Sequence, residues 1–213
     1  MGRSSRFGRQ EQESTWKNAE VEALYLLAGA GLRVPQPQGV YDGVLIMELV
    51  SDAEGHPAPR LNDVQPTPEQ AREWHAFLVG QVQRMLCLGM IHGDLSEYNV
   101  LLGADGPVII DLPQAVNAAG NNNAFRMLER DLNNLRTYCG AVAPELLATE
   151  YAHEMWKLFE AGELKVDTAL TGRFIHDATP ANVGDVLYEV DQARKEAEAR
   201  ERGRLAAAVA AEG

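Results

Sequence analysis

The sequence of 213 residues lacks the features of a membrane or secreted protein. No apolar run approaches the roughly 20 residues that a membrane-spanning helix needs. The residues from Met1 to Phe7 are polar and contain no apolar segment of the kind found in secretory signals. Cys87 and Cys139 stand far apart and form no C-x-x-C motif. We therefore expect a cytoplasmic protein with reduced thiols that does not span a membrane.

Positive charge is also scarce. The chain has 19 lysines and arginines against 31 aspartates and glutamates, for a net charge of −12. Sequence-independent binding of nucleic acid depends on many such cations at the phosphates, so a strong nucleic-acid surface is not expected. The first nine residues are locally basic (Arg3, Arg6 and Arg9), and we interpret them as a solvated tail.

The apolar pattern predicts strands early in the chain and mostly helices later. A helix is expected over residues 15–30, and a hairpin of strands 39–41 and 44–49 around Asp42-Gly43, a pair typical of two-residue turns. Residues 51–68 read as a loop that ends at Thr67, the expected N-cap of a long helix. The later helices are expected over residues 67–88, 123–139, 144–162 and 184–210. This order predicts a two-lobed α+β fold.

A second hairpin is predicted between residues 100–102 and 108–110, with its turn at 103–106. Residues paired across an antiparallel hairpin have positions with a constant sum. If Leu102 faces residue 107 or 108, then Asn99 faces residue 110 or 111. The hairpin therefore returns Asp111 to the side of Asn99.

Asp94, Asn99 and Asp111 are the candidate catalytic and metal-binding residues. An amide oxygen and a carboxylate that converge are hard ligands suited to Mg²⁺. Asp94 lies five residues before Asn99 and can accept a proton from an attacking hydroxyl while the metal holds phosphates. The same residues could merely cap a turn, but the full spacing favours phosphoryl transfer.

The segment from His92 to Asn99 (HGDLSEYN) resembles the catalytic loop of the RIO-type atypical protein kinases, and Ile110–Gln114 (IDLPQ) resembles their metal-binding segment. Pro57–Asp63 is similar to the family's linker, and Arg130–Asn134 (RDLNN) to its R-D-x-x-N motif. The resemblance covers residues 16 to 140. It is closest to the RIO1 branch, and then to a bacterial member.

The resemblance implies a serine/threonine protein kinase with a protein-kinase-like fold that uses ATP with Mg²⁺ or Mn²⁺. It makes Asp94 the catalytic base, with Asn99 and Asp111 as metal ligands. It also implies that Asp111 can carry a transient phosphoryl group, as an ATPase would require. The implied partners are ATP, an unidentified protein substrate and, through the family alone, the ribosome-assembly machinery.

Further site residues follow from the same resemblance. Met47 to Val50 (MELV) is similar to the hinge of the family, where backbone groups of Glu48 and Val50 would meet adenine. Glu20 takes the place of the glutamate on the family's N-lobe helix. The implied domains are a partial N-lobe over residues 1–49, a C-lobe over 50–183 and a C-terminal helix or tail over 184–213.

The sequence departs from the family pattern before this helix. The phosphate-covering loop and the strand lysine that pairs with the helix glutamate have no counterpart, since the only lysines are Lys17, Lys157, Lys165 and Lys195. Lys17 lies on the same predicted helix as Glu20 and cannot be the strand lysine. The chain is then either a fragment or wrongly started form of a longer kinase, or a remnant with weak catalysis. Loss of such electrostatic groups predicts very low turnover.

Two other functions stay open. A small-molecule phosphotransferase of the aminoglycoside or choline kinase kind shares the His-x-Asp-x-x-x-x-Asn spacing. A non-catalytic pseudokinase binding module would keep the lobe and lose the chemistry, as the absent lysine suggests.

Overall fold

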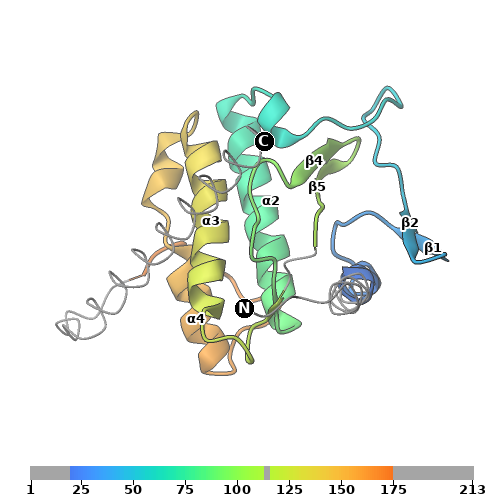
Figure 1. Ribbon diagram of the computed structural model, residues 1–213. Coiled ribbons are helices and arrows are strands. Elements are labelled where there is room, and N and C mark those ends of the chain that lie inside the picture. The colour runs from blue at the N-terminus through green and yellow to red at the C-terminus, as the bar shows by residue number, and fades with distance from the viewer. Residues whose placement is uncertain (1–19, 113–115, 175–213) are drawn as a thin grey trace, which may run out of the picture. The chain divides into compact units, whose positions relative to one another are not determined.

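The computed structural model describes residues 20–112 and 116–174, which belong to one compact unit. Within these ranges, helices combine with three two-stranded antiparallel sheets (Figure 1). The predicted α+β class is confirmed. None of the described helices is both long and apolar enough to cross a bilayer. The predicted start of the first helix, the C-terminal helix over 184–210 and Gln114 lie outside the described residues.

The described chain begins with a helix over residues 20–29, which is followed by a hairpin of β1 (Pro37–Tyr41) and β2 (Val44–Met47). Asp42 and Gly43 join these strands with φ angles of 49° and 74°. Two successive positive φ angles are what a type I′ turn requires. The hairpin predicted from this dipeptide is confirmed, although β1 begins two residues earlier and β2 ends two residues earlier than expected.

Helix α2 (Pro68–Cys87) is the longest described element. Thr67 caps it, because the Gln70 N–H donates to Thr67 Oγ1 at 3.3 Å and the Thr67 N–H donates to Gln70 Oε1 at 2.9 Å. This reciprocal capping box satisfies two backbone donors that the first turn would otherwise leave free. Gly89, with φ of 73°, follows the end of the helix. The predicted start and end of this helix are confirmed.

Helix α3 (Ala124–Gly140) lies beside α2 (Figure 1). Asn123 occupies its N-cap position, but the Asn123 side chain forms no capping hydrogen bond. Instead, the side chain of Asn121 accepts the Asn123 N–H at 2.8 Å. The side chain that closes the turn before α3 therefore belongs to a residue two positions before the N-cap.

The single helix predicted over residues 144–162 is wrong. The chain forms a 3₁₀ helix, η2 (Pro144–Ala148), and then α4 (Tyr151–Glu160). Leu146 O accepts both the N–H and the hydroxyl of Thr149, at 3.1 and 2.8 Å. The Glu150 N–H, which would continue a helix to Leu146 O, donates to Gly172 O at 2.8 Å. A distant backbone contact therefore divides the helix.

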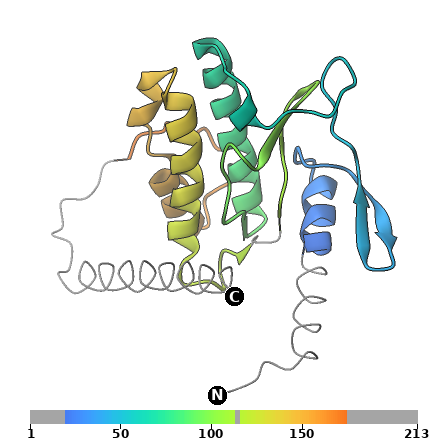
Figure 2. The same ribbon diagram turned by 45° about the horizontal axis from the view of Figure 1, so that its top comes forward.

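Short strands and turns carry the chain past these helices. Strand β3 (Met90–Ile91) pairs with β6 (Val116–Asn117), and β4 (Val100–Gly103) pairs with β5 (Gly106–Ile109). The predicted loop before α2 contains one 3₁₀ turn, η1 (Leu61–Asp63). Figure 2 shows the β4–β5 hairpin between α2 and the helix over residues 20–29.

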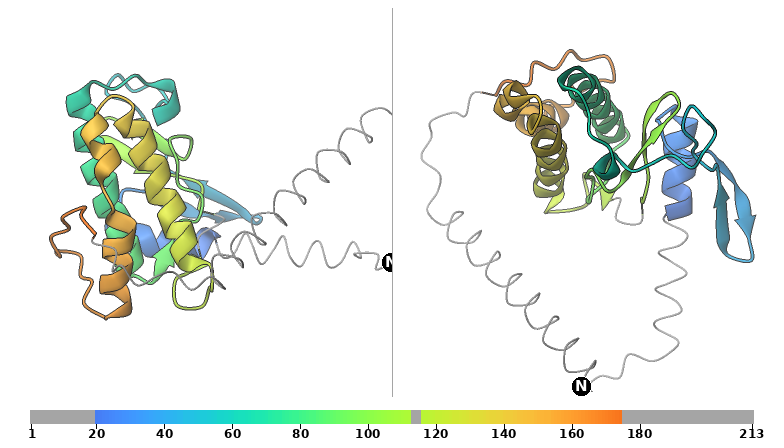
Figure 3. Two further views of the ribbon diagram at one scale, coloured as in Figure 1. Left: turned by 90° about the vertical axis from the view of Figure 1, so that its left-hand side faces the viewer. Right: turned by 90° about the horizontal axis from the view of Figure 1, so that it is seen from above.

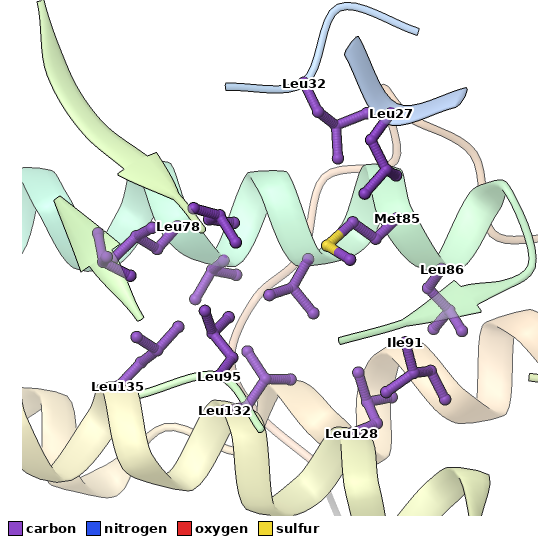
Figure 4. Packing of buried hydrophobic residues seen from close by; sticks show 14 of the residues in the cluster. Leu27, Leu32, Leu78, Met85, Leu86, Ile91, Leu95, Leu128, Leu132 and Leu135 are labelled. Atoms are coloured by element: carbon purple, nitrogen blue, oxygen red, sulfur yellow. The ribbon is translucent and has the colours of Figure 1, made fainter. Parts of the chain in front are cut away.

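The core lies between α2 and α3 and extends to the first helix (Figure 4). Ile91, at 2% exposure, lies between Leu86 of α2 and Leu128 of α3, and Leu95, at 0% exposure, lies beside Leu132 and Leu135 of α3. Both residues flank the segment from 92 to 94. Burial of these side chains therefore fixes the base of the loop that carries Asp94.

Candidate active site

The predicted catalytic segment, called the catalytic segment below, follows β3 and runs from His92 to Asn99. Gly93 has φ of 83°, a left-handed conformation that side chains disfavour. The glycine allows the chain to reverse directly before Asp94. The Asp94 side chain is half exposed at this bend.

Asp131 of α3 holds both sides of this bend. Its Oδ2 accepts the Gly93 N–H at 2.8 Å, and its Oδ1 accepts the Leu95 N–H at 2.9 Å. Asp131 is 1% exposed. Burial raises the pKa of Asp131 to about 7, while the two N–H donors act in the opposite direction. One carboxylate thus grips the residues directly before and after Asp94.

Two further α3 side chains complete the grip. Arg130 donates to Gly93 O, and its Nη2 lies 3.8 Å from Asp94 Oδ1. Asn134 donates through Nδ2 to Leu95 O at 2.9 Å. The sequence motif R-D-x-x-N was recognised, but its function as a clamp on the catalytic segment was not predicted. The spacing i, i+1 and i+4 on one helix was the available signal.

The second hairpin brings Asn99 and Asp111 together as the sequence predicted. Leu102 faces Pro107, the first of the two predicted registers. One step beyond the paired strands, the Ile110 N–H donates to Asn99 O at 3.0 Å. Asp111 follows immediately, with φ of 66°, a conformation seldom adopted by residues other than glycine, asparagine or aspartate.

The side chain of Asn99 also contacts the backbone of Asp94. Its Nδ2 donates to Asp94 O at 2.9 Å. The amide nitrogen is therefore used internally, which leaves Oδ1 as the group that can face a cation. Asp94 and Asn99 are in this way tied into one loop.

His92 links the two halves of the site. Its Nε2 lies 3.0 Å from Ile110 O, and the Asp94 N–H donates to Nδ1 at 3.3 Å. Because Nδ1 accepts, Nε2 carries the proton in this arrangement. Burial lowers the pKa of His92, so the neutral ring is favoured. These bonds give His92 a supporting function in the loop.

An open pocket of about 250 Å³ lies beside Asp111. Its lining includes Glu20 from the first helix and Met47 at the end of β2. The structure therefore places three predicted site residues, Glu20, Met47 and Asp111, around one space. Asp94 does not line this pocket. The remaining lining residues are Leu24, Pro35, Ile110 and Leu112.

In the predicted hinge, the Glu48 N–H and the Val50 carbonyl form hydrogen bonds within the chain. The Glu48 N–H donates to Gln36 O at 2.8 Å, and Val50 O accepts the Ala58 N–H at 2.9 Å. Among the described residues, no hydrogen bond is formed by Glu48 O or by the Val50 N–H. One acceptor and one donor, two residues apart, are thus available to a planar ligand. The Val50 side chain is buried against Gly103.

Comparison with known proteins decides the family. A family model described as the RIO domain matches residues 1–151. The chain belongs to the RIO domain family. It is 37% identical, over 124 residues, to the RIO-type serine/threonine-protein kinase Rio1 of Haloferax volcanii, covering 58% of this chain and 41% of that protein. The Rio1 kinase of Thermoplasma acidophilum is 32% identical over 133 residues, 62% of this chain and 68% of that protein.

Human serine/threonine-protein kinase RIO1 is 31% identical over 125 residues, 58% of this chain and 22% of that protein. The chain thus spans less than half the length of the Haloferax and human relatives. The resemblance to RIO-type kinases is confirmed, and with it a protein-kinase-like fold. Among the described residues, the part before the hinge consists of one helix and the β1–β2 hairpin. The domain boundaries near residues 49 and 183 stay predictions.

The RIO family implies the use of ATP and a divalent metal in general terms. The donor set of this chain fits such an ion, because Asn99 Oδ1 and the exposed Asp111 carboxylate are oxygen ligands. The hydrogen bond between Ile110 and Asn99 keeps the two donors on neighbouring strands of one hairpin end.

Proposed function

We propose that this RIO domain binds ATP with a divalent metal and transfers the γ-phosphoryl group to a serine or threonine of a protein. Asp94 is the base that accepts the hydroxyl proton, and Asn99 and Asp111 hold the metal. Bound metal would neutralise charge on the phosphates, with Mg²⁺ as the preferred ion and Mn²⁺ as the alternative. The protein substrate is unidentified, and a ribosome-assembly partner rests on the family alone.

One observation carries this proposal: a continuous hydrogen-bonded frame joins the three residues. Asp131 fixes the backbone on both sides of Asp94, and Asn99 donates to Asp94 O. Asn99 O then accepts from Ile110, next to Asp111. A turn-capping function would not require a buried carboxylate on another helix. Preorganised geometry of this kind is what phosphoryl transfer mainly demands of a protein.

The nucleotide base fits the hinge. Glu48 O can accept from an exocyclic amine, and the Val50 N–H can donate to a ring nitrogen. Met47 and Glu20, which both line the pocket beside Asp111, would then lie near the ligand. This arrangement supports adenine at residues 47–50 and phosphates toward Asp111.

A second candidate is nucleotide binding with little transfer. Within the described ranges, no lysine or arginine forms an ion pair with Glu20. Positive charge at the β- and γ-phosphates is a large part of transition-state stabilisation in phosphotransferases. Asp111 is exposed and could itself accept the phosphoryl group, with ADP leaving and water later hydrolysing the acyl phosphate. Either case predicts slow turnover.

The first test is calorimetric titration of ATP with and without Mg²⁺. We expect metal-dependent binding that Asp111→Asn removes. Asp105→Asn is the matched control, because Asp105 lies in the turn of the same hairpin and its side chain is 86% exposed. Absence of binding by folded protein, or equal binding by Asp111→Asn, would refute the nucleotide site.

Transfer is tested separately with γ-labelled ATP. Label on protein that depends on Asp94 supports the kinase. Label on a small amino alcohol with none on protein would support the small-molecule phosphotransferase. Binding without label on either would support the pseudokinase.

A further inference from the structure

The loop that follows the predicted hinge gathers three potential metal ligands. Asp52, Glu54 and His56 each offer one ligand atom, a carboxylate oxygen or an imidazole nitrogen, and these atoms all lie within 4.8 Å of one another. In the part of the chain that the structure describes, no other group of three such side chains converges in this way. Ligands that share a zinc ion stand about 2.1 Å from it, so shifts of roughly 1 Å would bring these atoms around one ion.

The backbone of the loop arranges these side chains. Asp52 Oδ1 accepts the Glu54 N–H at 3.0 Å and the His56 N–H at 2.9 Å. The Asp52 N–H in turn donates to His56 O at 2.8 Å, and Gly55, with φ of 84°, lets the chain reverse between them. Since the backbone uses Oδ1, Asp52 Oδ2 is the oxygen left for an ion, and it lies 3.7 Å from His56 Nδ1.

The base of the loop is attached to the rest of the fold. Val50 O accepts the Ala58 N–H at 2.9 Å, and Ser51 O accepts the Ala104 N–H at 2.9 Å. Ala104 belongs to the turn between β4 and β5, and Figures 2 and 3 show the segment between β2 and α2 passing beside this hairpin. The ligands therefore stand on a fixed base, while the His56 side chain, which is 75% exposed, can be reached from solvent.

The negative charge of the loop favours a cation. Two carboxylates at this distance repel each other unless positive charge lies beside them. Among residues 20–112 and 116–174, the ionic partner of Asp52 is His56, which is charged only when protonated, and Glu54 forms no ion pair. A bound divalent ion would offset both carboxylates at once.

The imidazole indicates the kind of ion. Mg²⁺ prefers oxygen ligands in an octahedral arrangement, whereas imidazole suits zinc and the neighbouring transition metals. Asn99 and Asp111 supply oxygen ligands alone, so the two donor sets differ. One nitrogen and two oxygens favour zinc, with water in the remaining position.

We propose that Asp52, Glu54 and His56 bind a divalent transition-metal ion of the zinc type, at a site separate from the proposed Mg·ATP site. The ion would tie the two ends of the loop, Asp52 and His56, to its tip at Glu54. Because the loop begins two residues after Val50, the bound ion would hold closed the segment that leaves the hinge.

The test is calorimetric titration of the whole chain with zinc chloride, without nucleotide and in excess Mg²⁺. We expect a single zinc ion that Mg²⁺ does not displace, and His56→Ala should weaken its binding at least about tenfold. Asp105→Asn is the matched control, because Asp105 is an exposed carboxylate on the neighbouring turn, and it should bind zinc as the wild type does. Circular dichroism checks that both variants fold. No zinc binding by folded wild type, or equal binding by His56→Ala, would overturn the proposal.

Spectroscopy separates this site from other ligands of the chain. Cobalt, titrated in place of zinc, absorbs strongly in the near ultraviolet when a thiolate binds it, and Cys87 is a partly exposed thiol. We expect no such band, and zinc should shift the backbone NMR signals of residues 50–58. A thiolate band, or shifts confined to other segments, would reject the site. No ATP is present in these measurements, so their failure leaves the kinase proposal intact.

Discussion

The catalytic segment and the β1–β2 hairpin are held in contrasting ways. Asp94 stands on a loop whose neighbouring amides are gripped by the buried Asp131. Among residues 20–112 and 116–174, each strand of the hairpin pairs only with the other. Eight of the thirteen exposed large apolar residues in the described chain lie within residues 20–49, although that range is a small part of it. The candidate catalytic segment is thus fixed by contacts within the described chain, whereas the apolar side chains of the hairpin are left exposed.

This contrast separates two kinds of mutational effect. Changes around Asp94 should reduce stability or transfer, because they break buried hydrogen bonds or remove the base. Changes to the exposed side chains of the hairpin should leave the unfolding free energy nearly unchanged.

The largest effect is expected from Asp94→Asn. Removal of a positioned general base typically costs 10²- to 10⁴-fold in rate. ATP affinity and unfolding free energy should change little, because the Asp94 carboxylate is half exposed and its nearest ionic partner is 3.8 Å away. Rates of label transfer and calorimetric affinity measure the two quantities, with Asp105→Asn as control. Transfer that survives in the variant would remove Asp94 from the mechanism.

Asp131→Ala tests the frame itself. It leaves the buried N–H groups of Gly93 and Leu95 without their acceptor. Each such orphan costs about 1–3 kcal/mol, so we expect roughly 3 kcal/mol less unfolding free energy in urea titrations. Asp131→Asn, which keeps one acceptor oxygen for an N–H, should lose less. If the alanine variant were as stable as Asp105→Ala, the grip on the catalytic segment would be unimportant.

The sequence predicted those features of the fold and of the candidate site that depend on local geometry. The turn at Asp42-Gly43, the cap at Thr67 and the return of Asp111 to Asn99 all follow from short-range spacing. Long-range contacts were not predictable in this way. The clamp by Asp131 joins segments 36 and 38 residues apart. The division of the predicted helix over 144–162 depends on Gly172 O accepting the Glu150 N–H.

A buried histidine gives the tightly packed region a pH dependence. His75 of α2 is 2% exposed, and burial, aided by the charge of Arg136, lowers its pKa to about 4 from 6.5. The folded state therefore binds fewer protons than the unfolded state between these values. Stability contributed by the neutral ring is present above pH 6.5 and is lost as the pH falls toward 4.

The loss should approach about 3 kcal/mol, since each pKa unit corresponds to about 1.4 kcal/mol. Urea titrations of wild type and His75→Gln across this range isolate the effect, because all other groups are common to both proteins. The wild type should lose stability more steeply on acidification. Parallel pH profiles would mean that His75 does not titrate with unfolding.

The smallest effect is expected on the hairpin. Tyr41→Ser removes a side chain that is 74% exposed, so the unfolding free energy should change by less than about 0.5 kcal/mol. Leu27→Ala is the matched comparison within the same region, because Leu27 is fully buried and such truncations cost about 2–5 kcal/mol. A large loss from Tyr41→Ser would mean that the exposed face is already covered in the isolated chain. A small loss would show that this apolar surface contributes little to the stability of the fold.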